Sequence, residues 1–128
     1  APEFVANIRR EAREAGLDNV TGVVNGPRDV KLDPASVDRV FIADTYHHFE
    51  YPEDTMASIH RALRPGGELV VIDFRRIPGR SSPWVMGHVR AGREVFTREI
   101  EAAGFVLEER LDFMPGQYFL RFRRAAAP

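Results

Sequence analysis

Titratable side chains gather in two short segments of this 128-residue sequence. The first is Asp-Thr-Tyr-His-His at residues 44–48, where two imidazoles and a carboxylate follow an apolar run. The second is Asp73 with the loop that leads from it to His88. Imidazoles titrate near neutral pH and suit general-base chemistry, and two neighbouring carboxylates can divide the roles of acid and base. His47, His48 and Asp73 are therefore the candidate catalytic residues, and Asp44 is the possible partner of Asp73.

Two apolar runs precede these segments and predict strands buried on both faces. They are Val37–Ala43 and residues 69–72. Between them, Pro52 and an apolar stripe that ends at Leu63 predict a helix, which Pro65 and the next two glycines stop. A strand, a helix and a second parallel strand form a right-handed unit, and ligands bind beyond the carboxyl ends of such strands. Both segments should therefore meet at one rim of a sheet.

The remaining elements complete a three-layer α/β pattern. We expect a helix over residues 4–15, a strand at 19–24, an irregular stretch at 74–88 and a helix near 95–103. Residues 105–113 and 117–123 predict an antiparallel hairpin, because only three residues join them. We expect one domain over residues 1–128, with a disordered tail at 125–128.

Composition excludes several classes of function. The formal net charge of −1 predicts no nucleic-acid partner, and no apolar run approaches the length that spans a bilayer. Cysteine is absent, which removes disulfides and thiolate chemistry. With no charged-then-apolar leader visible, we expect a cytoplasmic protein that acts on a small molecule.

Four sequence segments resemble one enzyme family: SVDRVFIAD (36–44), YHHF (46–49), LRPGGEL (63–69) and AAGF (102–105). Together they resemble class I S-adenosylmethionine-dependent methyltransferases, most closely the group that contains the quinone-biosynthesis C-methyltransferases. The resemblance implies a Rossmann-like fold and methyl transfer from S-adenosylmethionine to a small organic acceptor. It places Asp29, Asp44 and Tyr46 at the cofactor and Trp84 and His88 at the acceptor.

The sequence departs from that family in one respect. The family holds its cofactor at a glycine-rich turn after the first strand, and no G-x-G occurs in this sequence. The resemblance therefore implies the C-terminal part of the fold, N-terminally incomplete, with weak or absent cofactor binding. Val37–Ala43 would then lack its outer neighbour. We expect a homodimer to cover this edge, or the strand at 19–24 to pair with it.

Two other functions stay open, and a metal site is not expected. An esterase could use Ser81 or Ser82 with a histidine, although no G-x-S-x-G turn is present. A non-catalytic assembly module is the other alternative. A metal site is not predicted, because no two of the four histidines have the i, i+4 spacing of a helical site and His60 lies in mid-helix.

Overall fold

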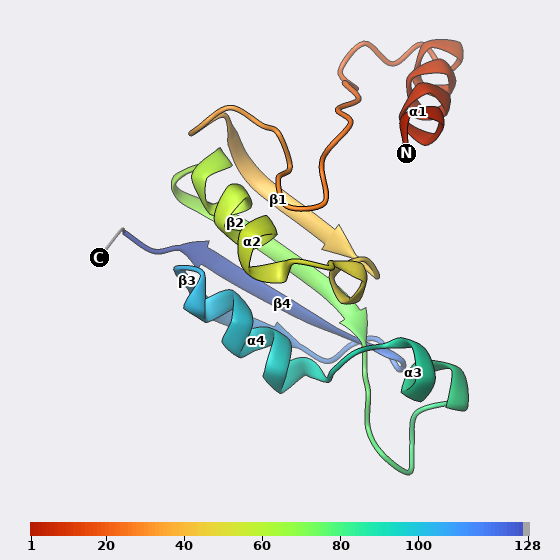
Figure 1. Ribbon diagram of the computed structural model, residues 1–128, viewed down its shortest axis with the longest axis vertical. Coiled ribbons are helices and arrows are strands. Elements are labelled where there is room, and N and C mark those ends of the chain that lie inside the picture. Colours follow the sequence, from red (N-terminus) through yellow and green to blue (C-terminus); the bar gives the residue numbers. More distant parts are fainter. Residues whose placement is uncertain (127–128) are drawn as a thin grey trace.

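The computed structural model describes residues 1–126 (Figure 1). The elements follow in the order α1 (Pro2–Glu14), β1 (Val37–Ala43), the short 3-10 helix η1 (Tyr46–His48), α2 (Pro52–Ala62), β2 (Leu63–Phe74), α3 (Pro83–His88), α4 (Arg93–Ala102), β3 (Phe105–Leu111) and β4 (Gln117–Arg124). This is an α/β fold of the predicted class, and β3 and β4 form the predicted antiparallel hairpin.

The four strands form one mixed sheet in the order β1-β2-β4-β3. β1 and β2 are parallel, with Val40 opposite Leu69 and Ala43 opposite Ile72. β4 is antiparallel to both of its neighbours. Parallel neighbours need a long crossover connection, and α2 provides it. The predicted strand Val37–Ala43 is confirmed, and the β1-α2-β2 unit brings two strand ends to the same edge of the sheet.

β2 is longer than the apolar run that predicts it, because it begins at Leu63, directly after α2. Gly66 and Gly67 lie within this strand. Gly66 has a φ of +77°, and a Cβ on Gly67 would lie 2.9 Å from the carbonyl oxygen of Arg64. These positions require glycine. The two glycines therefore shape an irregular start of the strand, where its pairing with β1 shifts register.

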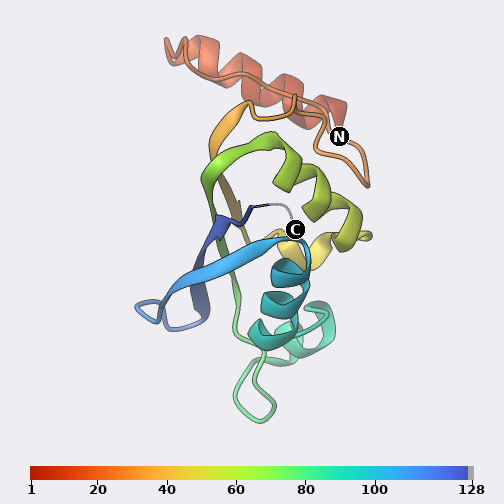
Figure 2. The ribbon, with the colours of Figure 1, turned by 90° about the vertical axis from the view of Figure 1, so that its left-hand side faces the viewer.

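α2 and α4 cover the same face of the sheet (Figure 2). The core between these helices and the strands contains Met56, Ile59, Leu69, Val71, Phe96, Ile100, Leu120 and Phe122. Burial along β2 alternates, and Ile42 is the buried residue of β1. The prediction that both strands are buried on both faces is therefore wrong. A strand is buried on both faces only when helices or another sheet pack on each face. Phe41 of β1, which points away from the core, is 65% exposed.

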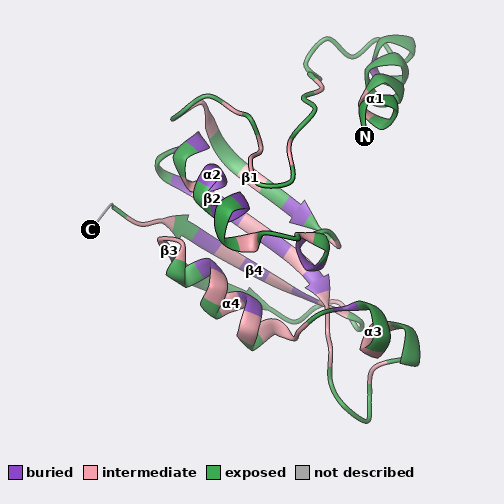
Figure 3. Ribbon diagram, viewed as in Figure 1, coloured by how far each residue is buried: buried purple, intermediate pink, exposed green. Residues whose placement is uncertain are grey.

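The helix at the N-terminus stands apart from this core. α1 lies at one end of the molecule and is almost wholly exposed, with Phe4 at 66% (Figure 3). The predicted helix is confirmed, but the strand predicted at residues 19–24 is wrong, because these residues form no strand. A strand needs a partner for its backbone groups, and β1 pairs with β2 alone among residues 1–126.

Residues 74–88 are more regular than predicted, since they contain α3. Ser82 caps this helix by accepting a hydrogen bond from the Val85 N–H at 3.2 Å, and Pro83 occupies its first turn. Of the tail 125–128, residues 125 and 126 have no regular secondary structure. Residues 127 and 128 lie outside the described part. Within residues 1–126, every helix is too short or too polar to cross a bilayer.

Candidate functional site

The candidate site lies at the edge of the sheet where β1 and β2 end. The backbone N–H of Asp44 donates to the carbonyl of Ile72 at 2.8 Å, so the two strand ends stay joined. Asp44 itself has a φ of +51°. This left-handed conformation is uncommon outside glycine but tolerated by aspartate, and it turns the chain into η1. Asp73 is the residue of β2 next to this turn.

Asp73 and His47 form a buried pair. The His47 side chain is 1% exposed and that of Asp73 is 0% exposed, with Nδ1 2.8 Å from Oδ1. Asp73 also accepts the backbone N–H of His47 at 3.1 Å and that of Phe74 at 2.7 Å. A carboxylate facing Nδ1 favours a proton on that nitrogen, which leaves the lone pair on Nε2. That Nε2 is buried and has no hydrogen-bond partner among residues 1–126.

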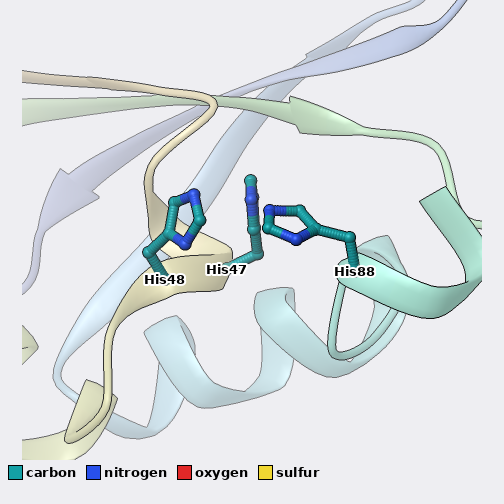
Figure 4. A group of neighbouring side chains, drawn as sticks. All are labelled: His47, His48 and His88. Carbon is teal, nitrogen blue, oxygen red and sulfur yellow. The ribbon is translucent and has the colours of Figure 1, made fainter. Parts of the chain in front are cut away.

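The structure brings His48 and His88 to the same place (Figure 4). Ring centroids lie 4.2 Å apart for His47 and His48, 5.1 Å apart for His47 and His88, and 5.0 Å apart for His48 and His88. One ring nitrogen from each residue can be chosen so that all three lie within 4.8 Å of one another. His47 is buried, whereas His48 and His88 are exposed, so the group opens to solvent on one side.

Aromatic rings form the neighbouring wall. Trp84 stacks on His88 with centroids 4.5 Å apart and meets Phe74 edge-on at 5.4 Å. Trp84 is 56% exposed, so much of its ring faces solvent. Trp84 and His88 were predicted at the acceptor, and both lie on α3 beside the Asp73–His47 pair. The assignment of an acceptor to them stays a prediction.

Asp44 has a partner that sequence reasoning missed. Gln117, the first residue of β4, donates from Nε2 to both carboxylate oxygens of Asp44 at 2.6 and 2.7 Å. Asp44 and Asp73 therefore do not form the predicted pair. Asp44 is bonded to Gln117, and Asp73 is bonded to His47. No local signal links residues 44 and 117, because the contact depends on β4 lying next to β2.

Two predicted cofactor residues are directed elsewhere. The ring of Tyr46 lies in the core, and its hydroxyl donates to Glu99 of α4 at 2.9 Å. Asp29 accepts the backbone N–H of Lys31 at 2.7 Å and lies 3.6 Å from Arg61 of α2. Both side chains therefore have structural partners away from the histidines. The assignment of Asp29 and Tyr46 to a cofactor stays a prediction, although the Tyr46 ring is fully buried and it is His47 that faces Asp73.

The serines considered for an esterase also have structural roles. Ser81 Oγ donates to the carbonyl of Arg75 at 2.6 Å and accepts the Ile77 N–H at 2.7 Å. Ser82 caps α3. Neither hydroxyl is bonded to an imidazole, so the structure gives the hydrolytic alternative no support.

A sequence model of a methyltransferase domain matches residues 1–71, more than half of the chain. The chain belongs to this methyltransferase domain family. The fold agrees. The methyltransferase domain resembles a crystal structure of a SAM-dependent methyltransferase from Aquifex aeolicus at a TM-score of 0.85 and 18% identity, over 98% of this chain and 65% of that one. It also resembles the [4+2]-cyclase SpnF at 0.81 and 19%, over 96% and 63%.

Identities this low establish the fold of the methyltransferase domain and leave its chemistry to its own residues. The chain spans less than two thirds of the length of either protein. No curated protein matches the sequence.

Proposed function

We propose that this chain forms the acceptor side of an S-adenosylmethionine-dependent methyltransferase that acts on a small organic molecule. The observation that carries the proposal is the family match over residues 1–71. The fold similarity over 98% of the chain supports it. So does the position of the Asp73–His47 pair, at the carboxyl ends of two parallel strands, where ligands of such sheets bind.

In this proposal the acceptor lies between η1 and α3, against the exposed face of Trp84. His47 Nε2 carries the lone pair, and it would take a hydroxyl proton of the acceptor once movement of the exposed His48 and His88 side chains gives the acceptor access to this buried atom. S-adenosylmethionine, when bound, would supply the methyl group to the deprotonated acceptor and depart as S-adenosylhomocysteine. Alignment of the methyl group supplies most of the acceleration and the base a smaller share. The resemblance of residues 36–49 and 63–69 to quinone C-methyltransferases makes a hydroxylated quinone the first acceptor to test.

Cofactor contacts available within this chain are few. Asp44 and Thr45 lie at the strand edge, but no G-x-G turn occurs in the sequence to bring backbone donors to the cofactor. We therefore expect the 128-residue chain to bind S-adenosylmethionine weakly or not at all. Calorimetric titration checks this, with an expected dissociation constant weaker than about 10 μM, or roughly −7 kcal/mol. Tighter binding at one site per chain would show that these 128 residues are enough to hold S-adenosylmethionine without a G-x-G turn.

The catalytic assignment is tested with the full-length product of the encoding gene. Release of S-adenosylhomocysteine is measured with hydroxyquinones and phenols as acceptors. His47→Gln should lower kcat by about 10²-fold or more, since general-base catalysis contributes that much. His60→Gln is the matched control, because His60 packs on Phe105 away from the rim. Unchanged turnover in His47→Gln would show that His47 is not the general base. Ester hydrolysis without methyl transfer would favour the esterase alternative over the proposed methyltransferase.

A further inference from the structure

Three imidazoles converge where a general base requires only one. His47, His48 and His88 come from η1 and α3, which are separated by more than thirty residues of chain, and their ring nitrogens approach within 4.8 Å. Three nitrogen ligands converging from two elements are the arrangement of a metal site.

His47 supplies the decisive atom. Its Nε2 is buried without a hydrogen-bond partner among the described residues, and the side chain is 1% exposed. A buried polar atom that lacks a partner is uncommon and requires an explanation. Because Asp73 engages Nδ1 at 2.8 Å, Nε2 is the nitrogen left with a lone pair, and Figure 4 shows the His47 ring between the rings of His48 and His88.

Asp73 has the position of a supporting residue in a metal site. Metal-binding histidines commonly donate their other ring N–H to a carboxylate, which fixes the ring and makes the ligand more basic. Here the carboxylate also accepts the backbone N–H of His47, so ring and main chain are held together. The ring of His88 is held in turn by stacking on Trp84.

We infer that His47, His48 and His88 bind one divalent transition-metal ion of the zinc class through three imidazole nitrogens. Nitrogens around a tetrahedral ion lie about 3.3 Å apart, so a closure of roughly 1.5 Å from the 4.8 Å limit is needed. The exposed side chain of His48 can supply this movement. Imidazole ligands without a carboxylate favour zinc, cobalt, nickel, copper or iron over magnesium and calcium.

Three protein ligands leave a fourth position open, as in catalytic zinc sites. This use of the site rests on the proposed function, whereas metal binding itself does not. An acceptor oxygen bound at the open position would lose its proton more readily, because a bound cation lowers the pKa of a coordinated oxygen. His47 would then act through the metal instead of taking the proton itself.

The test uses the tag-free 128-residue chain, stripped with a chelator and titrated with Zn²⁺ by calorimetry and with Co²⁺ by visible absorption. We expect one ion per chain, a dissociation constant tighter than about 10 μM, and the absorption bands of tetrahedral cobalt. His48→Ala and His88→Ala should each weaken binding at least about tenfold. Both residues are exposed, so these variants keep the fold. His60→Ala is the matched control and should bind like the unmodified chain.

Asp73→Asn tests the supporting carboxylate, with an expected loss of about 10- to 100-fold in metal affinity and an unchanged stoichiometry. Absence of binding at about 100 μM metal, or equal losses in His60→Ala and His88→Ala, would overturn the inference. The two proposals fail separately. Methyl transfer that needs His47 but no metal would support the general base and exclude a role of the metal in the reaction. Zinc binding without methyl transfer would support the metal site and exclude the proposed function.

Discussion

At Asp73, one carboxylate fixes both the ring and the backbone of the same histidine. It accepts three hydrogen bonds, two from His47 and one from Phe74, and is fully buried. The sequence predicts Asp73 as catalytic. Its geometry supports a narrower role, because it contacts His47 and is shielded from the rim. We therefore treat Asp73 as the residue that positions His47 and chooses which nitrogen carries the lone pair.

A second hydrogen-bonded network, buried at Tyr46 and open to solvent at Arg90, lies behind the site. The Tyr46 hydroxyl donates to Glu99, and Arg90 donates to both oxygens of that carboxylate at 2.7 and 2.8 Å. The hydrogen bond from Arg90 lowers the pKa of Glu99. Burial, followed by the charge of Glu99, raises the pKa of Tyr46 well above 10. Tyr46 thus anchors η1 to α4 and keeps its neighbour His47 facing the rim.

This raised pKa predicts a loss of stability at alkaline pH. Below about pH 10 Tyr46 is protonated in both states, whereas above it the unfolded chain ionises and the folded one does not. The free energy of unfolding should therefore fall by up to about 1.4 kcal/mol per pH unit above pH 10 for this residue. Urea unfolding between pH 8 and about 11 measures it.

Tyr46→Phe should make that decline shallower, because the ionisable group is gone. It should also lower stability at neutral pH by about 1–3 kcal/mol, since the bond to Glu99 is lost. Tyr51→Phe, at a residue that is 37% exposed, is the matched control. Equal alkaline slopes in Tyr46→Phe and the unmodified chain would contradict the argument.

At the scale of elements, local signals predict most of the fold. Apolar runs, proline starts and glycine stops locate α1, β1, α2, α4 and the hairpin, because each depends on residues close together in sequence. The failures depend on distant partners. Residues 19–24 have a strand-like composition but no sheet edge to pair with, and burial on both faces of β2 needs a second layer of helices. α3 was missed although Ser82-Pro83 is a helix-start signal.

The candidate site divides in the same way. Strand ends predict that residues 44–48 and 73 share a rim, which the register of β1 and β2 confirms. The convergence of His88 with His47 and His48 could not be predicted from spacing, because it depends on how the loop at 74–82 folds back. Spacing along a helix therefore does not decide whether the folded chain has a metal site.

Gly104, which joins α4 to β3, provides a prediction at this scale. Its φ is +99°, and a Cβ there would lie 2.9 Å from Nε2 of His60. Gly104→Ala should therefore lower stability by about 1–3 kcal/mol, measured by urea unfolding. Gly116→Ala, in the hairpin turn, is the control, because a Cβ would meet nothing within 4 Å.

The double variant Gly104→Ala with His60→Ala separates the two causes. If contact with His60 dominates, the loss in the double variant should be smaller than the sum of the single losses. If backbone strain dominates, the losses should add. A Gly104→Ala chain as stable as Gly116→Ala would show that the turn tolerates a side chain.

At the scale of the whole molecule, the outer edge of β1 is a strand edge with no partner among residues 1–126. β1 is an edge strand, and a hollow of about 260 Å³ lies between it, α2 and residues 25–32. Exposed strand edges with apolar side chains invite pairing with another chain. The first of the two expected remedies, a strand at 19–24 that pairs with β1, is wrong because no strand forms there.

The second remedy, a homodimer through β1, remains our prediction. Light scattering over a dilution series should give a dimer that dissociates on dilution. Phe41→Asp should shift the chain toward monomer, because it places a charge on the exposed row of β1. Phe113→Asp is the control, since Phe113 is equally exposed at 65% but lies on the hairpin turn. A monomer that persists at high concentration would contradict the dimer.

The strand order also constrains how the protein is made. β4 is the last strand to be synthesised, yet it lies between β2 and β3. Until residues 117–124 are available to pair, the β2 edge that β4 occupies has no partner within the sheet. Leu120 and Phe122, which belong to the core, also come from this segment. The sheet therefore cannot be completed before β4 is made, and the open edge of β2 needs protection until then.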